Sequence, residues 1–125
     1  MSPPLILLDA NALMMPFQFS LDLEGELTRL LGEYDLAVPS SVLRELEGLS
    51  PANPTTRAAL KFAARFRVIE VEGTGDEAIL ALAQAQGAGV LTNDRALRQR
   101  LREAGLPVIY LRERSRLEAI GFPSG

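Results

Sequence analysis

Cysteine and histidine, which carry much of enzyme chemistry, are both absent from this 125-residue chain. Without cysteine there is no disulfide, no zinc–thiolate or iron–sulfur site and no thiol nucleophile. Without histidine the chain lacks the most common general base, the serine triad and imidazole ligands for metals. Any chemistry must therefore use carboxylate, hydroxyl, amide, lysine or arginine groups.

Aromatic residues are scarce and tryptophan is absent, so the hydrophobic core must be built from Leu, Ile, Val and Ala. Hydrophobic residues make up 47% of the chain, which is typical of a globular protein and excludes extensive disorder. The length fits one domain with one core. The net charge of −3 argues mildly against a nucleic-acid partner, but the argument weakens if bound cations cancel several acids.

The first residues contain no basic segment, and their apolar run is too short for a signal peptide or a membrane span. No repeat and no low-complexity segment appears in the sequence. We therefore expect a soluble cytoplasmic protein without a membrane partner.

Short apolar runs alternate along the chain with segments of helical spacing. The apolar runs predict five strands, at residues 5–8, 36–38, 68–71, 89–92 and 108–111. The helical segments are 21–31, 41–49, 55–66, 76–86 and 94–104, with Ser40 or Ser41 and Thr55 or Thr56 as expected N-caps and a loop at 50–54. This alternation predicts an α/β fold whose mainly parallel sheet has helices on both faces.

Acidic residues occur where such a fold could bring them to one site. Asp9 and Asp94 each follow a predicted strand, and in parallel sheets ligands bind outside the carboxyl ends of the strands. Each helical residue advances by about 100°, so Asp76 shares a helix face with the apolar Ile79, whereas Glu77 does not.

The same geometry separates the acids of the other helices. In the predicted helix at residues 41–49, Glu45 lies at the edge of the apolar stripe, while Glu47 points away from it. Asp94 shares a face with the apolar Leu97. Three acids in helices are thus expected to face inward.

A single helical acid is usually solvated, so these acids are informative only as a set. Asp76 and Asp94 could be N-caps, because both begin predicted helices. Capping does not explain Glu45, which lies inside its helix, or Asp9, which ends a strand. Inward acids would repel one another unless a cation lay among them, and carboxylate ligands without nitrogen or sulfur favour Mg²⁺ or Mn²⁺.

Four motifs in this order resemble those of PIN domain nucleases. They are Leu7-Leu8-Asp9-Ala10-Asn11, Val42-Leu43-Arg44-Glu45-Leu46, Asp76-x-x-Ile79 and Thr92-Asn93-Asp94, and the resemblance extends from Leu5 to Leu111. It implies a three-layer α/β/α domain around a central, mainly parallel five-stranded sheet. We assign residues 1–112 to this domain and expect 113–125 to form a C-terminal tail or a short helix.

The resemblance also implies a metal-dependent endoribonuclease that binds one or two Mg²⁺ or Mn²⁺ ions. The catalytic and metal-binding residues would be Asp9, Glu45, Asp76 and Asp94, with Asn11, Thr92 and Asn93 supporting them. Asp94 could be a ligand or only a support, because the position of the fourth acid varies in the family. A hydrogen bond to the loop backbone is an equally good explanation of Asn11 and Thr92.

The sequence leaves the biological role open. The motifs look closer to the branch of the family that processes ribosomal RNA than to the toxins of toxin–antitoxin pairs. A toxin-type ribonuclease and a non-catalytic RNA-binding scaffold of a ribonucleoprotein are the alternatives. RNA is the expected partner, and a homodimer, an antitoxin or a ribonucleoprotein partner remains open.

Two surface features could serve RNA binding. Arg95, Arg98 and Arg102 form a basic stripe beginning beside Asp94, which suits a polyanionic backbone but could equally be a solvated helix face. The segment 14–19 is unusually apolar for a loop. Core packing is its default explanation, and a dimer interface or an RNA-stacking surface is the alternative.

Overall fold

A six-stranded sheet forms the centre of the computed structural model, which describes residues 2–49 and 52–123. Its strands, in spatial order, are β3 (Arg67–Ile69), β2 (Asp35–Pro39), β1 (Leu5–Leu8), β4 (Gly89–Leu91), β5 (Val108–Arg112) and β6 (Arg116–Ile120). The first five pair in parallel, and β6 pairs antiparallel to β5. The predicted α/β class and the mainly parallel sheet are confirmed. Residues 50 and 51 of the expected loop and 124–125 of the expected tail lie outside the described residues.

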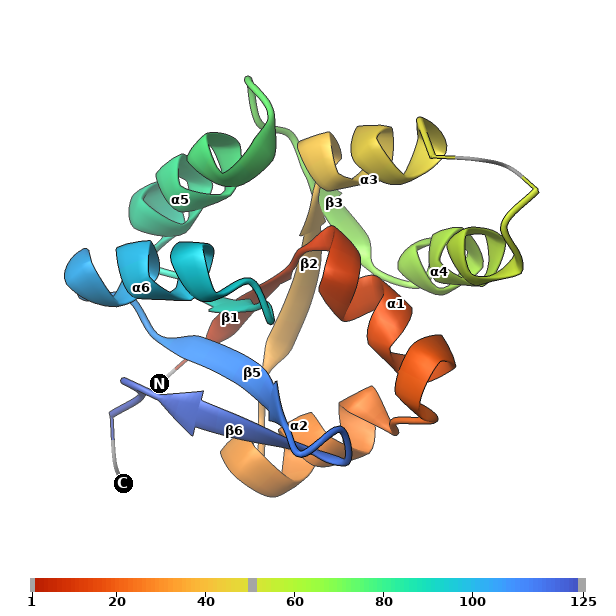
Figure 1. The fold of residues 1–125 in the computed structure, drawn as a ribbon. Helices are drawn as coiled ribbons and strands as arrows, with labels where there is room; N and C mark the ends of the chain where they lie inside the picture. Colours follow the sequence, from red (N-terminus) through yellow and green to blue (C-terminus); the bar gives the residue numbers. More distant parts are fainter. Residues whose placement is uncertain (1, 50–51, 124–125) are drawn as a thin grey trace.

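Helices cover both faces of this sheet. They are α1 (Ala10–Phe19), α2 (Leu23–Leu31), α3 (Ser40–Glu47), α4 (Pro54–Ala63), α5 (Gly75–Gln86) and α6 (Arg95–Glu103). Helices α5 and α6 lie on one side of the sheet, α1, α2 and α4 lie on the other, and α3 lies between α5 and α4 (Figure 1). No helix of the described chain is long and apolar enough to cross a membrane.

The sixth strand replaces the tail or short helix that we expected after residue 112. Its Leu117 is fully buried, and the Leu117 N–H donates to the Glu26 carboxylate of α2 at 2.8 Å. The turn before it places Glu113 and Arg114 in the left-handed region, with φ of 55° and 62°. Neither residue is the Gly or Asn that usually signals such a turn, so nothing local in the sequence predicted this hairpin.

The expectation of a loop at residues 14–19 was wrong, because these residues belong to α1. Proline is tolerated in the first turn of a helix and is unfavourable further in, yet Pro16 lies inside α1. Tertiary packing overrides this preference, since Met15 on the same helix is only 1% exposed. Phe17 is 45% exposed, so the apolar segment lies partly in the core and partly at the surface.

Two expected caps were wrong. Pro39 occupies the N-cap position of α3 without a side-chain hydrogen bond, and Ser40 and Ser41 are its first helical residues. The side chain of Asn53, instead of a threonine, caps α4 by accepting from Thr55 N–H at 2.8 Å. Serine, threonine and asparagine all cap well, so composition alone does not select one of several adjacent candidates.

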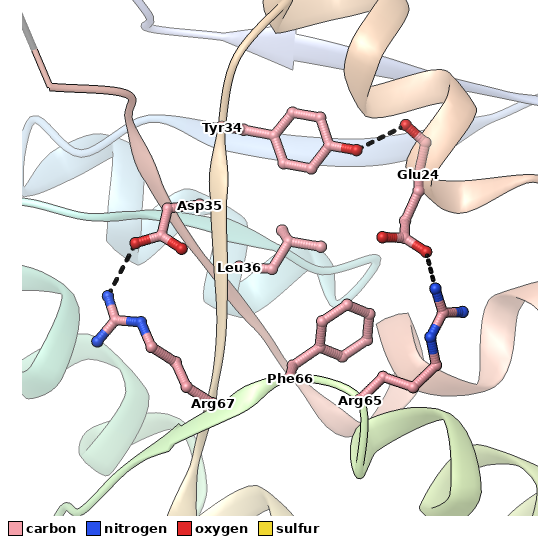
Figure 2. A pocket seen from close by; sticks show the side chains of 7 residues that line it. All are labelled: Glu24, Tyr34, Asp35, Leu36, Arg65, Phe66 and Arg67. Carbon is pink, nitrogen blue, oxygen red and sulfur yellow. Dashed lines mark hydrogen bonds and ion pairs between the residues drawn. The ribbon is translucent and has the colours of Figure 1, made fainter.

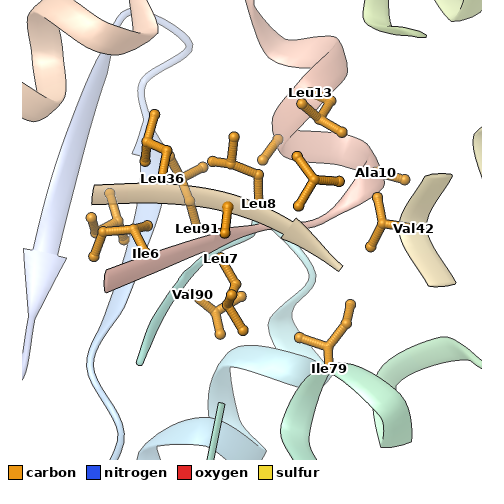
Figure 3. Close-up of a cluster of buried hydrophobic side chains, with 14 of the residues drawn as sticks. Ile6, Leu7, Leu8, Ala10, Leu13, Leu36, Val42, Ile79, Val90 and Leu91 are labelled. Atoms are coloured by element: carbon orange, nitrogen blue, oxygen red, sulfur yellow. The ribbon is translucent and has the colours of Figure 1, made fainter. Parts of the chain in front are cut away.

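The core is built from aliphatic residues, as the composition predicted. Side chains alternate across β1, so that Leu7 lies on the side of Ile79 from α5 and Leu8 on the side of Leu13 from α1 (Figure 3). All of β4 is buried as well. The central strands are therefore covered on both faces, and their carboxyl ends are held in fixed positions.

Candidate active site

A pocket of about 190 Å³ is lined by residues from the ends of β1 and β4 and from α1, α3, α5 and the start of α6. These elements come together at the carboxyl ends of β1 and β4 (Figure 1). All four predicted acids line this pocket, and we refer to it as the acid pocket. Its lining is Asp9, Ala10, Asn11, Met14, Glu45, Gly75, Asp76, Ile79 and Asp94. The fold thus brings together carboxylates that are up to 85 positions apart in the sequence, from residue 9 to residue 94.

Asp9 is the most deeply buried of these acids, with 5% of its surface exposed. It is also the N-cap of α1 and accepts a hydrogen bond from Ala12 N–H at 2.8 Å, a role that the sequence reading had excluded because α1 was not expected. Burial raises the pKa of Asp9 to about 7, although the hydrogen bonds from Thr92 and Ala12 act to lower it. The charges of Glu45 and Asp76 raise it further.

Asp76 lies in the first turn of α5 and is half-buried. Burial and the neighbouring charge of Asp94 raise its pKa, while Arg100 lowers it. Asp76 does not cap its helix, since Thr74 occupies that position. Its inward placement therefore has no capping explanation.

Asp94 is the N-cap of α6 and accepts from Leu97 N–H at 3.0 Å. One of its two carboxylate oxygens is thus committed to the helix. The structural role that we left open for Asp94 is observed, and its second oxygen remains for another function.

Helix α3 carries Glu45 into the acid pocket and also holds the loop that leads to Asp76. The Arg44 guanidinium donates to the carbonyl oxygens of Val71 and Gly73 at 3.3 and 3.4 Å. The Ser40 hydroxyl accepts from Val71 N–H at 2.9 Å. No sequence motif predicts this role of Arg44; its position next to Glu45 is the signal that the sequence offers.

The three predicted supporting residues connect the loops around the pocket. Asn11 Oδ1 accepts from Asn93 N–H at 3.0 Å, and Asn93 Oδ1 accepts from Leu111 N–H at 2.9 Å. The Thr92 hydroxyl, which is fully buried, accepts from Asp94 N–H at 3.1 Å and hydrogen-bonds to Asp9. Asn11 and Thr92 therefore both hydrogen-bond to the loop backbone, as one of the two explanations expected. Thr92 also links Asp9 to Asp94.

The chemistry of the pocket suits a hard divalent cation. Its ionisable side chains are all carboxylates, and the charges of Glu45 and Asp76 act on Asp9 in addition to its burial. Among the described residues, no three acidic side chains converge closely enough to bind one ion together. Mg²⁺ needs no such cage, because it keeps several waters and is commonly held by one or two carboxylates.

The predicted arginine stripe lies beside the acid pocket and not in it. Arg95, Arg98 and Arg102 line a separate groove with Gln99, Val108 and Ile120. Two of them also have structural contacts: Arg98 stacks over Tyr110, with its guanidinium carbon 4.3 Å from the ring centroid, and Arg102 donates to Leu106 O. The arginine whose charge lowers the pKa of Asp76 is Arg100, which is not part of the predicted stripe.

A second pocket, at the β2–β3 edge of the sheet, is a weaker candidate. Its charged groups pair with one another, as Arg65 does with Glu24 at 2.9 Å and Arg67 with Asp35 at 3.0 Å (Figure 2). Such paired and exposed groups leave little unsatisfied charge for a ligand.

Comparisons of the sequence and of the fold with known proteins agree with one another. A family described as "PIN like domain" matches residues 6–114. The chain is 34% identical to Ribonuclease VapC9 of Archaeoglobus fulgidus over 87% of this chain and 84% of that protein, and 26% identical to Ribonuclease VapC4 of Methanocaldococcus jannaschii over 91% and 95%. The solved structure of the PIN domain endonuclease Utp24 superposes with a TM-score of 0.79 at 25% identity, covering 96% of this chain and 93% of that one.

Proposed function

The chain belongs to the PIN-like domain family of nucleases, and on that premise we propose that it is a Mg²⁺- or Mn²⁺-dependent endoribonuclease that acts at the acid pocket. The observation that carries this proposal is the meeting of Asp9, Glu45, Asp76 and Asp94 around one cavity at the carboxyl end of the sheet. Two curated relatives are ribonucleases, which favours catalysis over the non-catalytic scaffold.

The carboxylates would hold one or two metal ions, with Asp9 and Asp94 using the oxygens that remain beside their capping bonds. A bound ion supplies a water of lowered pKa and neutralises charge on the phosphate. Thr92 keeps Asp9 and Asp94 at a fixed separation, and Arg44 fixes the loop that carries Asp76. The rigid sheet and these bonds hold the site in position before substrate binds.

RNA would approach along α6. The groove lined by Arg95, Arg98 and Arg102 supplies positive charge next to the negative pocket, as a phosphodiester chain requires. The Asn11–Asn93 hydrogen bond joins the first turn of α1 to the loop between β4 and α6.

A matched pair of variants in α3 tests the proposal. Glu45 lines the acid pocket, whereas Glu47, two residues further, does not. We expect Glu45→Gln and Asp9→Asn to abolish Mn²⁺-dependent cleavage of single-stranded RNA with unchanged circular dichroism, and Glu47→Gln to retain it. Equal activity of the two α3 variants, or a fully active Asp9→Asn protein, contradicts the assignment.

The biological role is a separate part of the proposal. The same chemistry would serve ribosomal RNA processing or a toxin-type ribonuclease that an antitoxin restrains. Mapping of new 5′ ends in cellular RNA after expression distinguishes the two: cuts confined to ribosomal precursors favour processing. Growth arrest that requires Asp9 favours the toxin role.

A further inference from the structure

A second cavity adjoins the acid pocket and has a different chemistry. It has a volume of about 300 Å³ and is lined by Asn11, Met15, Gln18, Phe19, Asn93 and Asp94. Two of these residues, Asn11 and Asp94, line the acid pocket as well. A molecule in this cavity, which we call the amide pocket, would therefore lie directly beside the proposed site of cleavage.

The two asparagines of the amide pocket have their side-chain nitrogen atoms left for a ligand. Asn11 Oδ1 accepts from Asn93 N–H, and Asn93 Oδ1 accepts from Leu111 N–H. Because both carbonyl oxygens are engaged by backbone groups, the orientation of each amide is determined by the hydrogen bonds. Within residues 2–49 and 52–123 neither amide nitrogen has a hydrogen-bond partner, so the pocket offers two fixed sets of N–H donors.

Gln18 adds an acceptor. Its Nε2 donates one N–H to the Met14 sulfur at 3.9 Å, which leaves Oε1 as an acceptor and the second N–H as a donor for a ligand. The pocket thus combines amide donors with an amide acceptor, and an apolar wall comes from buried Met15 and half-buried Phe19.

The hairpin between β5 and β6 supports this wall. Arg114 lies in its turn with φ of 62°, and its guanidinium carbon is 5.4 Å from the centroid of the Phe19 ring. This contact restrains the ring and leaves a positive charge beside it. Aromatic rings next to charged groups are the surfaces on which proteins stack unpaired bases.

We infer that the amide pocket binds the nucleobase adjacent to the cleaved phosphate and selects guanine or uracil over adenine, an inference that rests on the proposed ribonuclease function. Guanine and uracil each place a carbonyl oxygen beside a ring N–H. The oxygen would accept from the amides of Asn11 and Asn93, and the ring N–H would donate to Gln18. A carbonyl oxygen has two lone pairs and can accept from both asparagine amides at once. Each ring nitrogen of adenine has one lone pair and accepts from one amide only, and the amino group of adenine accepts from neither.

Cleavage of RNA oligonucleotides that contain one guanine, uracil or adenine in a polycytidine background tests the inference. We expect cleavage beside guanine or uracil to be about tenfold faster than beside adenine, as one well-formed set of base contacts provides. Phe19→Leu and Gln18→Leu should each reduce this ratio severalfold. Phe17→Ala, on the same helix but outside the pocket, is the matched control and should keep it. Equal rates in the unmodified protein, or an unchanged ratio in both pocket variants, overturn the inference.

A binding measurement separates failure of this inference from failure of the ribonuclease proposal. Side-chain amide signals of Asn11 and Asn93 can be followed by NMR while GMP, UMP or AMP is added to the full chain. Shifts of both amides with GMP and UMP, smaller with AMP, support the pocket even if no RNA is cut. Absence of shifts at millimolar nucleotide overturns it even if the acid pocket cleaves RNA.

Discussion

Burial of the Asp9 carboxyl group gives the fold an unusual dependence on pH. The pKa of Asp9 is raised from 3.8 in the unfolded chain to about 7 in the folded protein. Below pH 3.8 both states are protonated, and above pH 7 both are ionised. Between these values the unfolded chain releases a proton that the folded protein keeps, so the free energy of unfolding falls as pH rises.

The size of this effect follows from the shift of about three units. Each unit corresponds to about 1.4 kcal/mol, so ionised Asp9 destabilises the folded protein by about 4 kcal/mol, of which roughly 2.5 kcal/mol develops between pH 5 and pH 8. The raised pKa of Asp76 acts in the same direction. The lowered pKa values of Glu26 and Glu118 give stability that is lost only as pH falls below 4.5, outside this range.

Urea denaturation in a metal chelator, followed by circular dichroism because the chain has no tryptophan, measures this effect. The absence of histidine and cysteine leaves no other side-chain type that normally titrates between pH 5 and 8. Asp9→Asn keeps the cap on Ala12 but removes the charge, so we expect its pH dependence to be much smaller than that of the unmodified protein. A protein as stable at pH 8 as at pH 5, or an Asp9→Asn variant with the same slope, would refute the reasoning.

Three further predictions concern the metal, the arginine groove and the last strand. Mn²⁺ should raise the melting temperature more at pH 8 than at pH 5, because it binds ionised carboxylates, and should have little effect on Asp9→Asn; equal shifts in both proteins count against the acid pocket. Replacing Arg98 and Arg102 with Ala should lower the salt dependence of RNA binding by about one unit of slope for each lost phosphate contact, and an unchanged slope rejects the groove. Leu117→Ala should destabilise the fold by about 2–5 kcal/mol in urea denaturation, whereas a loss below 1 kcal/mol would mean that β6 adds little to the core.

The parts of the fold that the sequence predicted are those whose signals are local. Apolar runs such as Leu5–Leu8 form buried strands because every side chain finds a partner on one face or the other. Glycine ends α5 at Gly87, where the left-handed backbone with φ of 62° favours it. Helix periodicity also separated Glu45 from Glu47, and only the former lines the acid pocket.

Features that depend on contacts between distant segments were decided by the tertiary structure alone. Helix α1 forms despite Pro16 because its buried face packs into the core, and β6 forms because β5 and α2 offer partners to a short charged segment. The link between Asn11 and Asn93 joins residues 82 positions apart. The spacing of residues within one helix or strand does not predict such a long-range contact.

For the site, spacing along a helix selected Glu45 over Glu47 and Asp76 over Glu77 as acids that line the pocket. The expectation that the three helical acids face inward was wrong for two of them, since Asp76 is half-buried but Glu45 and Asp94 are exposed. The fold alone decided how they are used: Asp9 and Asp94 are caps as well as candidate ligands, and Arg100 rather than the predicted stripe acts on Asp76. The physical reason is that the burial of a side chain and the electrostatic potential at it depend on all the elements packed around the site. The sequence of one element does not contain the contribution of the others.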